Sequence, residues 1–206
     1  MVIAIDGPAG AGKSTVARAV ARELGFTYLD TGAMYRAVGL AAGETDEPAA
    51  DVAERIEIEV GDRVLVDGRD VTDAIRTSEV SLAASRVAAD PGVRAALVAK
   101  QQALMAEGDW VAEGRDIALV VAPDAEVKVF LTADPDERAR RRAAQRGDDP
   151  ATVRREQDAR DERDATGART VREPAPDAVP VDTTGQTLEQ VVAQVVTLAV
   201  EAAELR

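Results

Sequence analysis

A glycine-rich stretch near the start of the chain has the residue types and spacing that bind phosphate. It reads Gly7-Pro8-Ala9-Gly10-Ala11-Gly12-Lys13-Ser14-Thr15, which matches Gly, any four residues, Gly, Lys, then Ser or Thr. In such a loop, backbone N–H groups converge on a polyphosphate at the positive end of a helix. The Lys13 ammonium would reach the β- and γ-phosphates, and the Ser14 hydroxyl would hold Mg²⁺. The stretch therefore predicts a site for a nucleoside triphosphate.

The residues on both sides of this loop favour a phosphate site over a plain glycine turn. Before it, the apolar run 2–5 predicts a buried strand. After it, Val16, Val20 and Leu24 recur at helical spacing, and Gly25 is a typical residue just past a helix end. A strand, a glycine turn and a helix in this order are what a phosphate cradle needs.

A second candidate anion site follows the strand predicted at 26–29. Asp30 or Thr31 can cap a helix that begins near Ala33, which places Tyr35 and Arg36 in its first turns. A capped helix start with Tyr and Arg predicts a separate pocket for an anion. The alternative is a capped helix with an exposed arginine.

Charged residues also follow a short buried strand that begins at Trp110 and leads into Glu113-Gly114-Arg115-Asp116. In open parallel sheets, ligands bind beyond the carboxyl ends of the strands. We therefore expect Arg115 and Asp116 near the glycine loop. A structural ion pair between these two residues is the alternative.

Half of the arginines lie in one segment. Residues 136–172 contain 11 of the 22 arginines of the chain and 9 Asp and Glu, whereas the whole chain carries −13. Asp134-Pro135-Asp136-Glu137 is a strong helix start, and 147–150 separates a second charged helix that runs to about Asp164. This helical hairpin is predicted to be a mobile flap over the phosphates. Helices held by surface ion pairs are the alternative.

The remaining segments supply the other elements of an α/β chain. A polar linker is expected at 43–48, a β-hairpin at 56–66, and helices at 78–89 and 92–107. A strand is expected at 127–131, an edge strand at 179–182 because of Pro180, and a core-facing helix after the capping box at 187–190. The hairpin reads as an insertion into the α/β chain.

Composition excludes several classes of chemistry. The 206 residues contain no Cys and no His, which removes thiolate zinc sites, disulfides and every scheme with a histidine base. No apolar run is long enough for a membrane helix, and Met1 leads straight into the first strand, so we expect a cytoplasmic protein without a signal peptide. The acidity and scarcity of aromatic residues disfavour nucleic-acid binding.

Nearly from end to end, the chain resembles the bacterial cytidylate kinases, within the nucleoside monophosphate kinase group of P-loop proteins. The resemblance rests on the stretches 5–15, 29–36, 75–77, 113–116, 137–142 and 160–164. It implies an α/β fold with a P-loop parallel five-stranded sheet flanked by helices, a small inserted antiparallel β/α lobe and a helical arginine-rich lid. The expected boundaries are 1–42 and 90–206 for the core, about 138–165 for the lid, and 43–89 for the CMP-binding lobe.

The resemblance also implies a reaction: phosphoryl transfer from ATP, with Mg²⁺, to CMP or dCMP in pyrimidine nucleotide metabolism. ATP would bind the loop from Gly7 to Thr15, and CMP would bind nine residues: Thr31, Tyr35, Arg36, Ser85, Arg94, Arg115, Asp116, Arg160 and Asp164. Of these, Arg160 and Asp164 would hold the ribose. The catalytic residues implied are Lys13, Arg115, Arg138 and Arg142. The expected partners are these small molecules alone, with no nucleic acid and no membrane, and a monomer is expected.

The sequence departs from the family pattern at three places. Gly167 stands where an arginine is usual. Either Arg169 or Arg172 substitutes for it in contacting the ribose, or the ribose contact is weaker and the preference for deoxyribose changes. The flap segment between Arg146 and Arg160 is shorter than in many relatives. Glu113 stands where aspartate is common.

Two other functions are compatible with the loop alone. A small-molecule kinase such as shikimate or gluconate kinase has a similar loop, but a neutral acceptor needs no Tyr-Arg phosphate clamp. A GTP-binding switch would normally show an Asn-Lys-x-Asp run, which this sequence lacks.

Overall fold

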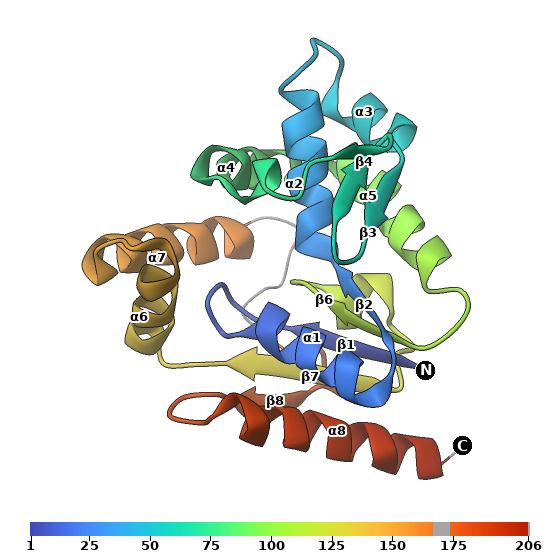
Figure 1. The fold of residues 1–206 in the computed structure, drawn as a ribbon, viewed down its shortest axis with the longest axis vertical. Helices are drawn as coiled ribbons and strands as arrows, with labels where there is room; N and C mark the ends of the chain where they lie inside the picture. Colours follow the sequence, from blue (N-terminus) through green and yellow to red (C-terminus); the bar gives the residue numbers. More distant parts are fainter. Residues whose placement is uncertain (167–173, 206) are drawn as a thin grey trace. The chain divides into compact units, whose positions relative to one another are not determined.

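In the computed structural model the described residues are 1–166 and 174–205, of which 145–146 and 160–166 are described by their backbone alone. The chain divides into two compact units, seen as a ribbon in Figure 1. The first unit is Met1–Tyr28 with Gly108–Arg206, and the second is Leu29–Glu107. The lobe expected at 43–89 lies within the second unit.

A five-stranded sheet forms the centre of the first unit, and the boundary between the two units falls within its strand β2. Its strands are β1 (Val2–Asp6), β2 (Thr27–Asp30), β6 (Trp110–Glu113), β7 (Val127–Thr132) and β8 (Val179–Asp182). Their order is β2-β6-β1-β7-β8, and β1 pairs in parallel with both β6 and β7. This confirms the predicted parallel sheet, including the edge position of β8, which contains Pro180.

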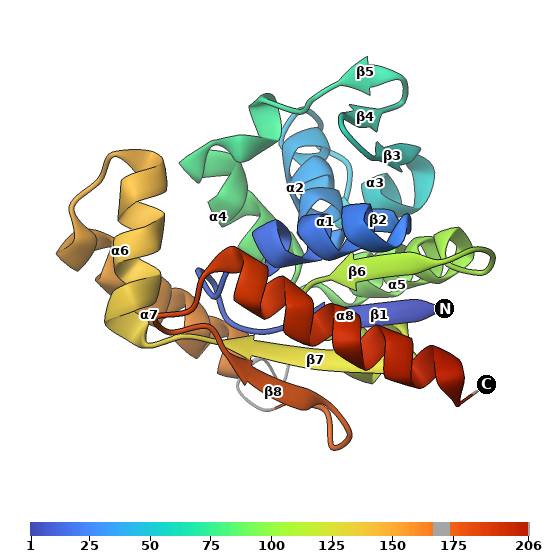
Figure 2. The same ribbon diagram turned by 60° about the horizontal axis from the view of Figure 1, so that its bottom comes forward.

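Two helices cover one face of this sheet. Helices α1 (Lys13–Leu24) and α8 (Leu188–Glu204) pack on each other and on the sheet (Figures 1 and 2). Ile3 and Ile5 point to this face and join Val20 and Val195 in the core. Since side chains alternate along a strand, Ala4 and Asp6 point to the opposite face. The core is aliphatic because aromatic residues make up only 2% of the chain.

The arginine-rich segment forms two adjacent helices, α6 (Pro135–Arg146) and α7 (Pro150–Thr166), as predicted (Figure 2). The Asp134 carboxylate caps α6 by accepting hydrogen bonds from the backbone N–H groups of Asp136 and Glu137 at 2.9 and 3.1 Å. Ala139, Ala143 and Val153 are buried, so the hairpin has a small apolar face of its own. We call α6 and α7 the flap.

The second unit combines helices with a small antiparallel sheet. The helices are α2 (Thr31–Ala42), α3 (Ala49–Arg55), the 3-10 turn η1 (Ala74–Arg76), α4 (Ser78–Val87) and α5 (Pro91–Leu104). The strands are β3 (Ile58–Val60), β4 (Val64–Val66) and β5 (Arg69–Asp70). The hairpin of β3 and β4 was predicted, whereas α3 and β5 are too short for their patterns to be read from the sequence.

One π-helical turn lies in the first unit. It is η2 (Ile117–Val121), which follows directly on the predicted site residues Arg115 and Asp116. Among the described residues, none of the helices has both the length and the apolar character that a membrane crossing requires.

A glycine sets the distance between α2 and α4. A Cβ at Gly39 would lie 2.9 Å from the backbone N of Ala84 and 3.1 Å from the backbone C of Ala83. The two helix backbones therefore approach more closely than any larger residue would allow. This contact fixes the second half of α4, including Ser85, against α2.

We expect Gly39→Ala to destabilise the protein by about 1–3 kcal/mol, because the added methyl group meets backbone atoms that cannot move aside cheaply. The measurement is urea unfolding followed by circular dichroism. The matched control is Gly43→Ala, at the end of the same helix, where φ is −75° and the nearest atom is 3.4 Å away. Equal stability of the two variants would contradict the close packing of α2 on α4.

Candidate active site

The loop from Gly7 to Thr15 runs from the end of β1 into the first turn of α1, as the sequence predicts. Gly10 has a φ of 80°, in the left-handed region that disfavours larger residues. A Cβ at Gly10 would also lie 2.6 Å from the Gln157 Nε2 atom and 3.1 Å from the Arg138 Cβ atom. The glycine thus allows the flap to approach the loop backbone. We call residues 7–15 the phosphate loop.

Lys13 is buried at the start of α1, with its charged end directed back to the loop. Its ammonium group donates a hydrogen bond to the Pro8 carbonyl at 2.9 Å. The lysine is thereby held beside the loop N–H groups, where a phosphate chain would bind.

Ser14 is tied to a carboxylate on the neighbouring strand. Its hydroxyl donates to Glu113 Oε1 at 2.6 Å, and the Tyr28 hydroxyl donates to the same oxygen at 3.2 Å. The parallel register places Glu113 opposite Ile5, so its side chain lies at the carboxyl edge of the sheet beside the loop. A hydroxyl and a carboxylate are hard oxygen donors, the kind that Mg²⁺ uses together with nucleotide phosphates. In the described part of the chain, no group of three or more His, Cys, Asp or Glu could hold a metal by itself.

Asp6, the last residue of β1, is a buried carboxylate. Its two oxygens accept hydrogen bonds from the backbone N–H groups of Ile117 at 2.9 Å and Ala118 at 2.8 Å. Burial raises the pKa of Asp6 to about 6, and the charge of Asp116 adds to this effect. The two N–H groups and the Lys13 charge act in the opposite direction.

The flap contacts the phosphate loop through Arg138. This buried arginine donates from Nη1 to the Ala9 carbonyl at 3.0 Å, and the Gln157 side chain of α7 donates to the Arg138 carbonyl at 3.4 Å. Arg142, one turn further along α6, is exposed. Two of the predicted catalytic residues therefore differ in setting: Arg138 is buried against the loop, and the Arg142 side chain is exposed.

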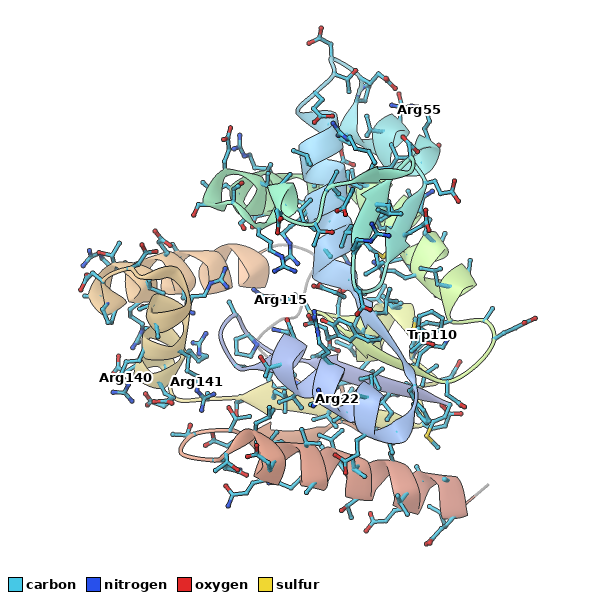
Figure 3. All side chains as sticks on the ribbon, viewed as in Figure 1. Arg22, Arg55, Trp110, Arg115, Arg140 and Arg141 are labelled. Carbon is cyan, nitrogen blue, oxygen red and sulfur yellow. The ribbon has the colours of Figure 1, made fainter. Side chains whose placement is uncertain are left out.

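Other flap arginines have structural partners. Figure 3 shows Arg140 and Arg141 on α6. Arg141 donates to the hydroxyl and the carbonyl of Thr183 at 2.9 and 2.8 Å. The Thr183 hydroxyl lies 3.0 Å from the Thr132 carbonyl and 3.3 Å from the Ala11 carbonyl, and it can donate to either. Glu137 accepts from Arg140 at 2.7 Å and from Arg141 at 3.0 Å. The alternative of an ion-paired helix therefore holds for these two arginines.

In the second unit, Asp30 organises the predicted anion site at the start of α2. Its Oδ1 atom accepts from the Ala33 N–H at 2.8 Å, and its Oδ2 atom accepts from Arg36 Nη2 at 3.1 Å. Of the two candidate caps, Asp30 rather than Thr31 fills that role. Thr31 and Tyr35 are buried in the same helix. One carboxylate thus caps the helix and orients the arginine.

Ser85 and Arg94 belong to the same unit. The Ser85 hydroxyl donates to the Ser81 carbonyl at 3.2 Å within α4. Arg94 lies in the first turns of α5, whose N–H groups at Gly92 and Val93 are capped by Asp90 at 2.7 and 3.3 Å.

The other predicted CMP-binding residues lie in the first unit. Arg115, labelled in Figure 3, and the buried Asp116 follow the carboxyl end of β6. Arg160 and Asp164 lie on α7, where only the backbone is described. Gly167, Arg169 and Arg172 lie outside the described residues.

Several polar residues of the site were not singled out from the sequence. They are Asp6, Tyr28, Gln157 and Thr183, whose contacts join segments far apart in the chain. For Asp6 a signal was present, since a carboxylate that ends an otherwise apolar strand must find partners when buried.

The sequence is similar to known cytidylate kinases over almost its whole length. The family model described as "Cytidylate kinase" matches residues 3–201. The cytidylate kinase of Desulfitobacterium hafniense is 47% identical over 211 residues, which cover 95% of this chain and 91% of that protein. The cytidylate kinase of Carboxydothermus hydrogenoformans is 48% identical over 210 residues, with 94% and 95% covered.

Solved structures of other kinases share the fold at low identity. A gluconokinase from Sinorhizobium meliloti superposes with a TM-score of 0.54 at 17% identity, covering 99% of this chain and 94% of that one. A shikimate kinase from Bacteroides thetaiotaomicron gives 0.53 at 16% identity, with 99% and 98% covered. These two likenesses concern the fold alone.

The raised pKa of Asp6 predicts a pH dependence of stability. Between pH 3.8, where the unfolded carboxyl ionises, and about pH 6, the folded state binds the proton more tightly. The contribution of Asp6 is therefore fully present below pH 3.8 and is lost as pH rises through about 6. We expect the free energy of unfolding of the wild type, relative to Asp6→Asn, to fall by about 3 kcal/mol across this window.

The measurement is urea unfolding of both proteins at a series of pH values. Taking the difference between them removes the other carboxylates, such as Asp182, whose pKa is lowered by its hydrogen bonds with Thr184. A difference that is flat across the window would contradict the raised pKa of Asp6.

Proposed function

Because the chain belongs to the cytidylate kinase family, it is a phosphotransferase that phosphorylates CMP, and we propose which of its residues bind ATP and which bind CMP or dCMP. The observation that most strongly supports ATP binding is the phosphate loop with the buried Lys13 near its end. The small-molecule kinases share the fold at 17% and 16% identity, so they do not favour the alternative of a neutral acceptor.

The phosphate loop binds the triphosphate of ATP. We expect its N–H groups and the Lys13 ammonium to surround the β- and γ-phosphates, because these groups neutralise phosphate charge. Ser14 and Glu113 are the oxygen donors available to Mg²⁺. When bound, Mg²⁺ would neutralise charge on the phosphate oxygens.

The acceptor phosphate of CMP binds Thr31, Tyr35, Arg36 and Arg115. The Asp30 carboxylate holds Arg36 at 3.1 Å and so reduces the number of conformations that the guanidinium must lose on binding. A phosphate monoester is largely ionised at neutral pH, so it can attack without a general base. The absence of histidine is therefore no obstacle to this reaction.

The cytosine base binds Ser85, Arg94 and Asp116. Cytosine presents an amino donor at N4 beside acceptors at N3 and O2. A carboxylate accepts from N4, and an arginine donates to the other two atoms. Uracil presents an acceptor where cytosine has the amino group, so a carboxylate disfavours it.

The flap arginines stabilise charge on the transferring phosphoryl group. Arg138 already lies against the loop, and Arg142 lies one helical turn away. Arg160 and Asp164 hold the ribose. Such a flap excludes water, which would otherwise hydrolyse ATP without any transfer to CMP. A monomeric, cytoplasmic enzyme that binds neither nucleic acid nor membrane stays a prediction from the sequence.

The function is tested by following ADP formation in a coupled assay with ATP, Mg²⁺ and a panel of nucleoside monophosphates. We expect CMP and dCMP to be the best acceptors and shikimate and gluconate to be inactive. An enzyme that phosphorylates AMP or GMP faster than CMP would refute the assignment.

Asp116→Ala is expected to reduce the preference for CMP over UMP by about tenfold or more, because the N4 amino group loses its acceptor. The KM for ATP should change little. The measurement is kcat/KM for both monophosphates, with Asp124→Ala, an exposed carboxylate of the same unit, as the control. An unchanged CMP to UMP ratio would remove Asp116 from base recognition.

Lys13→Ala is expected to lower kcat by about a hundredfold or more while the fold is retained, because the transferring phosphate loses the positive charge of the Lys13 ammonium. Circular dichroism verifies the fold, and the coupled assay gives the rate. Lys128→Ala, which loses an ion pair with Asp177 at 2.6 Å, is the matched lysine control. A near-normal rate in Lys13→Ala would mean that ATP binds elsewhere.

A further inference from the structure

The carboxylate at the end of β1 has no role in the reaction described above, yet its contacts are specific. Asp6 is 5% exposed, and its two oxygens accept from two consecutive backbone N–H groups. The donors are Ile117 and Ala118, more than a hundred residues away in sequence, at 2.9 and 2.8 Å. Such a paired contact fixes the donor segment in both position and direction.

The donor segment is the start of the π-helical turn η2. Within it, Val120 N–H donates to the Asp116 carbonyl at 2.9 Å and Ala122 N–H donates to the Ile117 carbonyl at 2.7 Å. The first N–H groups of any helix have no acceptor within it. Ile117 and Ala118 are buried, so water cannot easily serve in place of a protein acceptor. Asp6 is the acceptor that this turn needs.

Asp116 lies directly before this turn, at its N-cap position. The Asp116 backbone has φ −149° and ψ 30°, outside the helical region, at the point where the chain leaves β6 and enters η2. The direction of its side chain therefore depends on where the next two residues are held. π-helical turns are rare, and they occur frequently at functional sites.

We propose that Asp6 is a positioning residue for CMP recognition, which holds the backbone of Ile117 and Ala118 so that Asp116 is aimed at the cytosine amino group. This inference rests on the proposed role of Asp116. Asp6 itself would touch neither substrate.

The charged groups around Asp6 include residues proposed to bind CMP and residues proposed to bind ATP. Burial raises the pKa of Asp6 to about 6, so the carboxylate is mainly ionised at neutral pH and accepts both N–H groups. The charged groups that face it are Asp116, from the segment after β6, and Lys13, from the start of α1. A test must therefore separate an effect on CMP from an effect on ATP.

The experiment uses Asp6→Asn, which keeps the size of the side chain but leaves one oxygen acceptor for two N–H donors. We expect kcat/KM for CMP to fall about tenfold, mainly through KM, and the CMP to UMP ratio to fall with it. The KM for ATP should change by less than about twofold, because the phosphate loop is unchanged. In the double variant Asp6→Asn/Asp116→Ala, the ratio should fall no further than in Asp116→Ala alone.

The control is Thr187→Ala, which removes the cap at the start of α8, where Thr187 accepts from the Gln190 N–H at 3.3 Å. It should lower stability without changing the CMP to UMP ratio. If Asp116→Ala changes the ratio and Asp6→Asn does not, the positioning role is overturned and the proposed function stands. If neither variant changes it, the base-reading role of Asp116 is wrong, and the positioning role is wrong with it.

A measurement on the wild type covers the case in which Asp6→Asn does not fold. In an NMR titration, the amide resonances of Ile117 and Ala118 should shift together with the Asp6 carboxyl carbon, at a midpoint near pH 6. Amide resonances that do not move while Asp6 titrates would overturn the contact and the proposal.

Discussion

The parallel pairing of β1 with β6 and β7 is the constraint on which the first unit depends. It brings the carboxyl ends of these strands to one edge of the sheet, where β1 continues into the phosphate loop. The same pairing places Asp6, Glu113 and Asp116 at that edge, all buried. Carboxylates beside a phosphate site disfavour phosphate binding unless hydrogen-bond donors compensate their negative charge. The structure supplies such donors: Ser14 and Tyr28 for Glu113, and two backbone N–H groups for Asp6.

Hydrogen bonds also attach the flap to the phosphate loop. Arg138 donates to the Ala9 carbonyl, and Arg141 is linked to the Ala11 carbonyl through Thr183. Of the α6 arginines whose side chains are described, Arg138 contacts the phosphate loop and Arg141 contacts Thr183, whereas the side chains of Arg140 and Arg142 are exposed. The number of arginines in this segment of the sequence did not reveal which of them hold the flap in place and which are exposed.

Local signals in the sequence predicted most of the fold. Asp134-Pro135 and Thr187 start α6 and α8 as their capping patterns indicate, and the phosphate loop lies between a strand and a helix. What the sequence could not provide depends on pairing across long stretches of chain. The partners of Asp6 and Ser14 are about a hundred residues away, and no spacing encodes them. β5 has two residues, too few for an alternating pattern to be recognised.

The central proposal is that one chain binds two phosphorylated substrates at once, a triphosphate at the phosphate loop and a monophosphate at a separate anion site. The most direct test is calorimetric titration of CMP into the protein, with and without a saturating nonhydrolysable ATP analogue. We expect one CMP per chain in both titrations, because both ligands are bound at once. Loss of CMP binding when the analogue is present would mean that the two compete for a single site, and would contradict the account.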